Sequence, residues 1–237
     1  MKNQRVLTFL SLISLTIFFL FVSGCVPAKK TEDVTRVIPM DIERTPTTLA
    51  ILPFENNSVT DPQTYDPLCK GLSAMLITDL SNAGTSLKLI ERGKIQSLLK
   101  EIALSQTGSI DHSTAISAGR ILGAQSIAFG SFMVLGKQVR IDTRIIKVET
   151  SEVMMAESIT GSSSNFMELE GKLAQKIAGA LHVAFQPKKS SGSDINAALY
   201  FSEGLEALDR GNKAEAQRLF DKSIALDPAY KTQIDNL

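Results

Sequence analysis

The first 24 residues carry the feature that most limits how this chain can fold. Lys2 and Arg5 precede an apolar run from Val6 to Val22, and residues 2–5 contain no acidic side chain. A basic start followed by such a run is the layout of a secretory signal. The run lies at the short end of the roughly 20 residues that a membrane-spanning helix needs. We therefore expect residues 1–24 to be a leader that takes no part in the folded core.

The leader ends in a short motif that suggests a lipid attachment. Val22-Ser23-Gly24-Cys25 resembles the bacterial lipoprotein box, in which an apolar residue and two small residues precede a cysteine. The resemblance implies cleavage between Gly24 and Cys25. It also implies a diacylglyceryl group on the Cys25 thiol and an acyl chain such as palmitate on the freed amine. The alternative is a signal anchor with an incidental cysteine.

The lipid on Cys25 is the only cofactor that we expect. Two or more acyl chains hold a protein stably on a membrane, whereas one does so only marginally. Val26 stands where an inner-membrane sorting signal would have Asp. By resemblance to lipoprotein sorting, this favours the outer membrane of a Gram-negative bacterium, with the protein facing the periplasm. Outer-membrane lipid is then one expected partner.

Composition excludes several classes of function. Lys plus Arg and Asp plus Glu are both 25, which argues against the basic surface of a nucleic-acid-binding protein. Two cysteines rule out a disulfide-rich scaffold, and two histidines leave little for a metal site. No phosphate loop, nucleophile elbow or zinc-protease motif occurs, so we expect no small-molecule substrate. Cys69 is expected to be buried in a helix as a small hydrophobe.

Hydrophobic periodicity predicts a mixed sheet with helices packed on it. The residues from Glu55 to Pro67 are interpreted as a loop. Short connections between the last three strands predict an antiparallel meander. The predicted strands are 48–53, 87–90, 124–135, 138–148 and 153–160, and the predicted helices are 68–83, 95–108, 113–122 and 166–181.

The fold class is accordingly α/β (α+β), a mixed sheet with an antiparallel meander flanked by helices. Five segments are predicted along the chain. They are the leader 1–24, the lipidated cysteine with a flexible tether 25–47, the α/β domain 48–186, a linker 187–193 and a helical hairpin 194–237.

The hairpin resembles a single tetratricopeptide repeat. Tyr200, Gly204 and Phe220 stand at its aromatic and small positions, although Glu203 replaces the usual leucine. One such repeat cannot bury its own apolar face. It must therefore dock on the α/β domain, on another subunit or on a partner. We expect the core to stay folded when residues 194–237 are removed.

The α/β segment resembles the curli production and transport lipoprotein family, called CsgG-like. The resemblance lies in four segments in the family's order, together with the lipoprotein box. These segments are Ala74–Leu80, Leu89–Arg92 with the helix that follows, Phe129–Ser131, and Arg144–Thr150.

The chain departs from the family members that form a secretion pore. Those members carry two long amphipathic hairpins per subunit. Here the corresponding connections are Gly136-Lys137-Gln138 and the residues from Gly161 to Asn165, both too short for a hairpin of about 20 residues. We therefore expect no pore.

Glu91-Arg92 is the polar pair that the family resemblance singles out. We interpret it as a structural signature at a strand end, where Arg92 can pair with a carboxylate. Asp111-His112-Ser113 contains the residue types of a catalytic triad, but triads come from separated positions. Asp111 is therefore predicted to cap a helix. No catalytic residue and no metal ligand is assigned, and paired carboxylates from distant positions stay open.

The resemblance implies a non-enzymatic factor of the cell envelope, either in curli-type assembly and export or in oligomerisation. Its expected partner is a second copy or another envelope protein. Two further functions stay open: a lipoprotein that activates a peptidoglycan synthase or supports the flagellum, and a subunit of a secretion pore.

Overall fold

A computed structural model describes residues 46–83, 87–105, 111–186 and 194–237. These residues form one compact unit that begins at Glu43. The leader, the lipoprotein box and most of the tether lie outside the described residues, as does the linker 187–193. No helix of the described ranges is long and apolar enough to cross a membrane.

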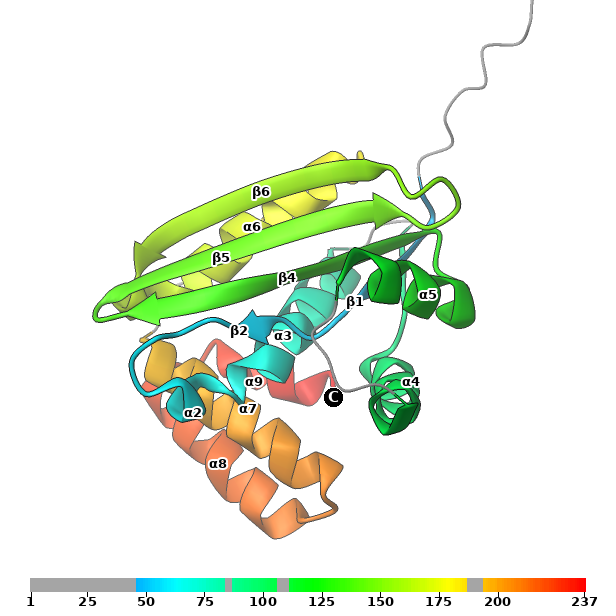
Figure 1. The fold of residues 1–237 in the computed structure, drawn as a ribbon. Helices are drawn as coiled ribbons and strands as arrows, with labels where there is room; N and C mark the ends of the chain where they lie inside the picture. Colours follow the sequence, from blue (N-terminus) through cyan, green and yellow to red (C-terminus); the bar gives the residue numbers. More distant parts are fainter. Residues whose placement is uncertain (1–45, 84–86, 106–110, 187–193) are drawn as a thin grey trace, which may run out of the picture. The chain divides into compact units, whose positions relative to one another are not determined.

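The fold is the predicted mixed sheet with helices packed on it (Figure 1). Of the six strands, five follow the order β3-β1-β4-β5-β6, and the sixth, β2, pairs with β4. The strands are β1 (Thr48–Ile51), β2 (Glu55–Asn56), β3 (Lys88–Leu89), β4 (Ser126–Leu135), β5 (Gln138–Lys147) and β6 (Val153–Ser162). The α-helices are α2 (Pro62–Tyr65), α3 (Leu68–Asn82), α4 (Arg92–Ser105), α5 (His112–Leu122), α6 (Phe166–Ala180), α7 (Ile195–Asp209), α8 (Lys213–Leu226) and α9 (Tyr230–Asp235).

The sheet joins a parallel half to an antiparallel half along β4. Strands β1 and β3 run parallel, and β1 pairs parallel with the first residues of β4. On the other side of β4, strands β5 and β6 form the predicted antiparallel meander. The turn between β4 and β5 is Gly136-Lys137, with Gly136 in a left-handed conformation (φ 59°). A single 3₁₀ turn, η1 (Ser163–Asn165), connects β6 to α6.

The segment predicted as a loop, 55–67, contains β2 and α2. Strand β1 covers only the first half of β4, so Glu55 and Asn56 add to the second half, in register with Ser131 and Phe132. The Asn56 side-chain amide closes the segment by donating to Pro62 O at 2.7 Å and to Asp66 Oδ1 at 2.8 Å. Strand β2 forms because it pairs with a strand that is distant in the sequence, so its local sequence does not predict it.

The two faces of the sheet are covered unequally. Helices α3 and α6 pack on one face, called the inner face, over a core that contains Leu72, Ile141 and Leu173. Helices α4 and α5 pack on the opposite outer face, but only over its parallel end, around Ile127 and Ile146. Figure 1 shows no helix over the outer face of the rest of the meander. Parallel strands are normally buried on both faces, whereas antiparallel strands can face water on one.

The C-terminal helices dock on α3, which settles one question that the sequence leaves open. Gly71 of α3 lies so close to α7 that a Cβ there would stand 1.8 Å from Ser202 Oγ and 2.7 Å from Ser202 Cβ. Gln233 of α9 donates to Asp79 Oδ1 of α3 at 2.7 Å. The core on α3 continues into Phe201 and Leu205 of α7. Because removal of residues 194–237 would expose this surface, we replace the expectation of a stable core with one of destabilisation.

Helices α7 and α8 form the predicted hairpin around Gly211-Asn212. Ser223 Oγ of α8 donates to Ala197 O of α7 at 2.8 Å, and both groups are buried. The ring of Phe201 contacts those of Phe220 and Tyr230, with centroids 6.1 and 5.6 Å away. The range 194–237 that was predicted as a hairpin also contains a third helix, α9, which packs on α7 and α8. The assignment to a tetratricopeptide-like repeat stays a prediction.

A fully buried acid lies where α3, α6 and α9 meet. Glu170 of α6 is 0% exposed. Burial first, and then the negative charge of Asp79 on α3, raise the pKa of Glu170 well above its usual range. A protonated Glu170 can donate a hydrogen bond to the Asp79 carboxylate, which already accepts one from Gln233. The packing of α9 is therefore linked to a carboxyl whose pKa is raised by burial and by Asp79.

We predict that replacing Gly71 with alanine separates α3 from α7. The added methyl group would overlap Ser202, and overpacking of this kind costs about 1 to 3 kcal/mol of unfolding free energy. Gly179→Ala is the matched control, because nothing lies within 4 Å of its Cβ position. The control should be neutral or stabilising by up to about 1 kcal/mol. Urea unfolding measures both, and equal effects would contradict the close packing.

We predict that the chain loses stability as pH rises because of Glu170. Its folded pKa is above its unfolded pKa, so the folded state binds more protons between these two values. The contribution of protonated Glu170 to the free energy of unfolding is full below the usual carboxyl pKa. It is lost as the pH rises toward the pKa of Glu170 in the folded state. Glu170→Gln should flatten this dependence and raise the melting temperature at about pH 8.

Glu168→Gln is the control for this pH experiment. Glu168 lies on the same helix but is exposed, where it pairs with Lys172. Its replacement should leave the pH dependence unchanged. A wild-type chain whose stability rises from about pH 5 to pH 8 would refute the assignment of a neutral Glu170.

Candidate functional site

The uncovered outer face of the meander is the candidate site. Alternate residues of each strand point to this face because side chains alternate along a strand. Register places them in three rows across β4, β5 and β6. The rows are Phe129, Arg144 and Ala156; Ser131, Asp142 and Ser158; and Met133, Arg140 and Thr160.

The site is hollowed into an open cavity of about 650 Å³. Its floor is the middle of the three strands, and Asp111 and His112, at the start of α5, stand at one end. Glu55 of β2 lines the cavity as well. Most of its lining is polar or charged, so it suits a ligand or surface that makes hydrogen bonds.

Gly130 allows β4 to approach β5 closely under this cavity. A Cβ at Gly130 would stand 1.9 Å from the carbonyl oxygen of Asp142. The family-like segment Phe129-Gly130-Ser131 therefore has a physical reason. Phe129 closes the outer core, Gly130 permits strand contact, and Ser131 opens onto the cavity.

Arg140 and Asp142 form a two-pronged ion pair within β5. The Arg140 guanidinium donates to both Asp142 oxygens, with distances of 2.7 to 3.1 Å. These hydrogen bonds are the main cause that lowers the pKa of Asp142. Both side chains are about half exposed, so the pair organises the surface more than it stabilises the fold.

Arg144 is the cation that this site leaves without a direct partner. Four acids line the cavity. Asp142 is engaged by Arg140, Asp111 caps α5, and Glu157 turns to the inner face and accepts from Lys176 at 2.8 Å. The fourth is Glu55 of β2. In the described ranges no hydrogen bond or ion pair holds the exposed Arg144 guanidinium, although Asp142 lies within electrostatic reach. The site therefore offers a positive charge to a ligand.

The triad-like sequence Asp111-His112-Ser113 forms a helix cap, as predicted. Asp111 Oδ1 accepts hydrogen bonds from Thr114 N at 2.7 Å and from Ser113 Oγ at 2.9 Å. These bonds lower the pKa of Asp111. Ser113 is thus committed to the carboxylate rather than to a histidine. Within the described ranges, no three His, Cys, Asp or Glu side chains gather as metal ligands would.

Cys69 lies in α3, as predicted, but is only partly buried. Burial, and then the charge of Asp66, raise the pKa of its thiol to about 11. A thiol with so high a pKa stays protonated and is a poor nucleophile. Gly24 and Cys25, the predicted cleavage and lipidation residues, lie outside the described residues.

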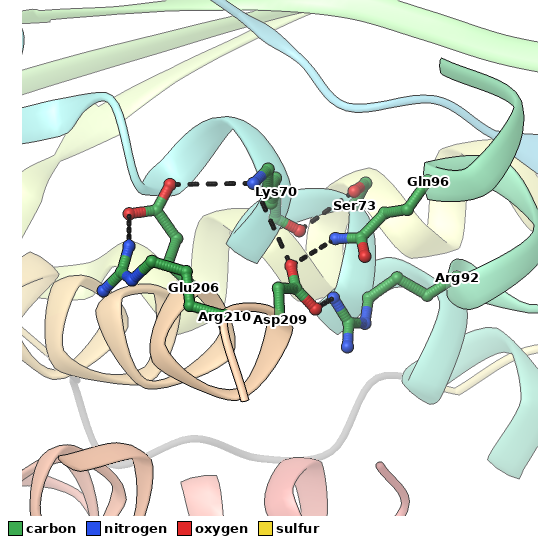
Figure 2. A network of polar contacts seen from close by, with 7 residues as sticks. All are labelled: Lys70, Ser73, Arg92, Gln96, Glu206, Asp209 and Arg210. Carbon is green, nitrogen blue, oxygen red and sulfur yellow. Dashed lines mark hydrogen bonds and ion pairs between the residues drawn. The ribbon is translucent and has the colours of Figure 1, made fainter. Parts of the chain in front are cut away.

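The signature residues Glu91 and Arg92 lie at the start of α4, away from the cavity. Arg92 Nη1 pairs with Asp209 Oδ1 of α7 at 2.8 Å, and Gln96 of α4 donates to the other oxygen of Asp209. Figure 2 shows this network, in which Lys70 of α3 also reaches Asp209 and Glu206 at 3.9 and 3.8 Å. Sequence pattern indicated that Arg92 pairs with a carboxylate. It could not identify Asp209, which is 117 residues away.

We predict that Arg92 and Asp209 are energetically coupled. In a double-mutant cycle with Arg92→Ala and Asp209→Ala, the coupling should be about 1 kcal/mol, because both side chains are mostly buried. The exposed pair of Arg218 and Glu215 is the matched control and should couple clearly less. Chemical unfolding measures each variant. Coupling no larger than in the control would show that the network does not fasten α7 to α4.

Comparisons with known proteins give one family match. Residues 43–140 match the family described as "Curli production assembly/transport component CsgG". The matched range runs from just before β1 to the first residues of β5. It contains Glu91 and Arg92 and ends before β6 and the C-terminal helices. No curated protein matches the chain.

Several solved structures resemble part of the chain, and the three that follow are each 16% identical to it. The LpoB C-terminal domain from Salmonella enterica has a TM-score of 0.33 and covers 49% of this chain and 82% of its own. Lipoprotein GNA1162 from Neisseria meningitidis has a TM-score of 0.40, with 56% and 97% covered. A PelC dodecamer from Paraburkholderia phytofirmans has a TM-score of 0.36, with 56% and 86% covered.

Structural similarities this weak decide neither fold nor function. The family match therefore rests on the amino-acid sequence alone. Three of the four motif segments, Ala74–Leu80, Leu89–Arg92 and Phe129–Ser131, lie within the matched range, and Arg144–Thr150 lies beyond it. The recognition predicted from the motifs is confirmed: residues 43–140 match the curli production assembly/transport component family.

Proposed function

We propose that this chain is a lipid-anchored accessory protein of the cell envelope that works by binding a protein partner. The observation that carries the proposal is the uncovered outer face of the meander, with its open polar cavity and the unpaired Arg144. The family match supports a role in assembly or transport in the envelope. Among the described residues no group of His, Cys, Asp or Glu side chains is arranged to hold a metal ion at the cavity.

The proposed anchor is a lipid on Cys25, and the segment 25–47 serves as a tether. Confinement to the outer membrane raises the effective concentration of the binding face toward any envelope partner. A tether of this length lets the folded unit reach away from the membrane surface. Weak contacts at a small polar face then suffice for binding, because the anchored protein and an envelope partner are already held close to the same membrane.

The C-terminal helices have a supporting part in this proposal. The network around Asp209 and the close packing at Gly71 fasten α7 to α3 and α4. Their apolar faces are used inside the unit, so we propose that partner binding lies on the sheet rather than in the helical hairpin.

We predict that a partner crosslinks to the outer face in living cells. A photo-crosslinking residue at Ser131, in the cavity, should capture a specific envelope protein. The same residue at Gln217, exposed on α8, should not, and it is the matched control. Arg144→Glu should reduce capture at Ser131 at least about tenfold, since it reverses the charge at the site. Equal capture at both positions, or none at Ser131, would overturn the proposal.

The proposed anchor has its own measurement. Cys25→Ala should move the protein from the membrane fraction to the soluble periplasmic fraction, because the acyl chains supply the membrane affinity. Mass spectrometry of the wild-type N-terminus should show a triacylated cysteine. A variant that still pellets with membranes as the wild type does would refute lipid anchoring without bearing on the outer face.

A further inference from the structure

Strand β6 is a long free edge of the sheet. It has ten residues and forms the outermost strand in Figure 1. Among the described strands only β5 pairs with it. The opposite edge strand, β3, has only two residues. Strand β2 pairs with the part of β4 that β1 does not reach. An unpaired strand edge presents a row of N–H and C=O groups that can bind another extended chain.

The register shows which backbone groups of β6 point away from the sheet. Ser163 N donates to Lys137 O at 2.9 Å, directly beyond the register pair Gln138 and Ser162. In an antiparallel pair, alternate residues bond to the neighbouring strand and those between point outward. Ala156, Ser158 and Thr160 therefore direct their N–H and C=O groups outward.

The β6 edge lacks most of the features that block strand addition. Between Val153 and Ser162 there is no proline and no lysine, and Glu157 is the sole charged residue. Charged and proline residues are the usual protection of exposed edges. Glu157 points to the inner face and is held by Lys176 of α6. The edge is thus open over the length of a normal strand.

Side chains beside this edge select the chemistry of an added strand. On the inner face, Met155 and Ile159 of the core border the edge, which favours apolar side chains. On the outer face, β6 carries only small side chains at Ala156, Ser158 and Thr160. Arg144, across from Ala156, is separated from an added strand by two strand spacings, about 10 Å. The long arginine can cross these small residues to reach a carboxylate.

We propose that β6 binds an extended acidic segment of a partner protein as a seventh strand, by backbone hydrogen bonds at Ala156, Ser158 and Thr160 and an ion pair at Arg144. The inference rests on the proposed partner binding and names its mode. The segment alternates apolar residues toward α6 with acidic residues toward Arg144. A second copy of β6 fits less well, because its own outer-face residues include no acid.

The test uses the full chain and a blocked nine-residue peptide that alternates valine with glutamate. Binding should slow amide exchange at Ala156, Ser158 and Thr160, measured by nuclear magnetic resonance. Ser158→Pro removes an outward N–H without removing a bond to β5, and it should weaken binding at least about tenfold. Ser158→Ala, the matched control, keeps the N–H and should bind as wild type does. A peptide with lysine in place of glutamate should bind at least about tenfold more weakly.

Arg144→Gln should abolish the preference for the glutamate peptide over its glutamine counterpart. The proposal is overturned if the peptide does not bind, if exchange slows elsewhere than at the β6 edge, or if wild type self-associates through β6 in sedimentation. Should Ser158→Pro not fold, the wild-type exchange pattern and Arg144→Gln still decide. The crosslinking experiment with the photo-crosslinking residue at Ser131 can be repeated in the Ser158→Pro variant. If the partner is still captured as strongly as in the wild type, strand addition is wrong, while partner binding at the outer face stands.

Discussion

The burial of α3 between the sheet and the C-terminal helices is the constraint on which the rest of the structure depends. One side of α3 covers the inner face of the sheet, and the other side receives α7 at Gly71. Glycine is needed there because the two helices leave no room for a side chain. The hairpin therefore completes the core rather than hanging from it. Beside this contact, Asp209 of α7 pairs with Arg92 of α4 and lies 3.9 Å from Lys70 of α3.

Unequal covering of the sheet creates the candidate site. Where strands are parallel, helices cover both faces and bury Ile127 and Ile146. Beyond Phe129 the outer face has no helix, and the same strands carry serine, aspartate and arginine instead. The change from apolar to polar residues along one face of β5 thus marks the limit of the core. Beyond it lies the polar face on which we propose that a partner binds.

Much of the α/β fold could be predicted from the sequence, because it depends on local patterns. Alternating residues gave β4, β5 and β6, short connections gave the meander, and Asp111 and Gly123 marked the ends of α5. The short strand β2 was missed because it depends on pairing with β4, some 75 residues away, and the four-residue helix α2 beside it was missed as well. The signature pair was recognised by motif, and its partner Asp209 was not, since residue spacing carries no sign of a contact across 117 positions.

The sequence by itself indicated the order of the longer strands and helices and the family match of residues 43–140, and it predicts a leader that ends at a candidate lipid site. These follow from periodicity and short motifs, which neighbouring residues encode. Only the tertiary structure decided where the hairpin docks, which face of the sheet the described helices leave open, and that Arg144 has no hydrogen-bond or ion-pair partner among the described residues. Those facts depend on which surfaces meet, and hydrophobic burial selects that arrangement among residues far apart in the chain.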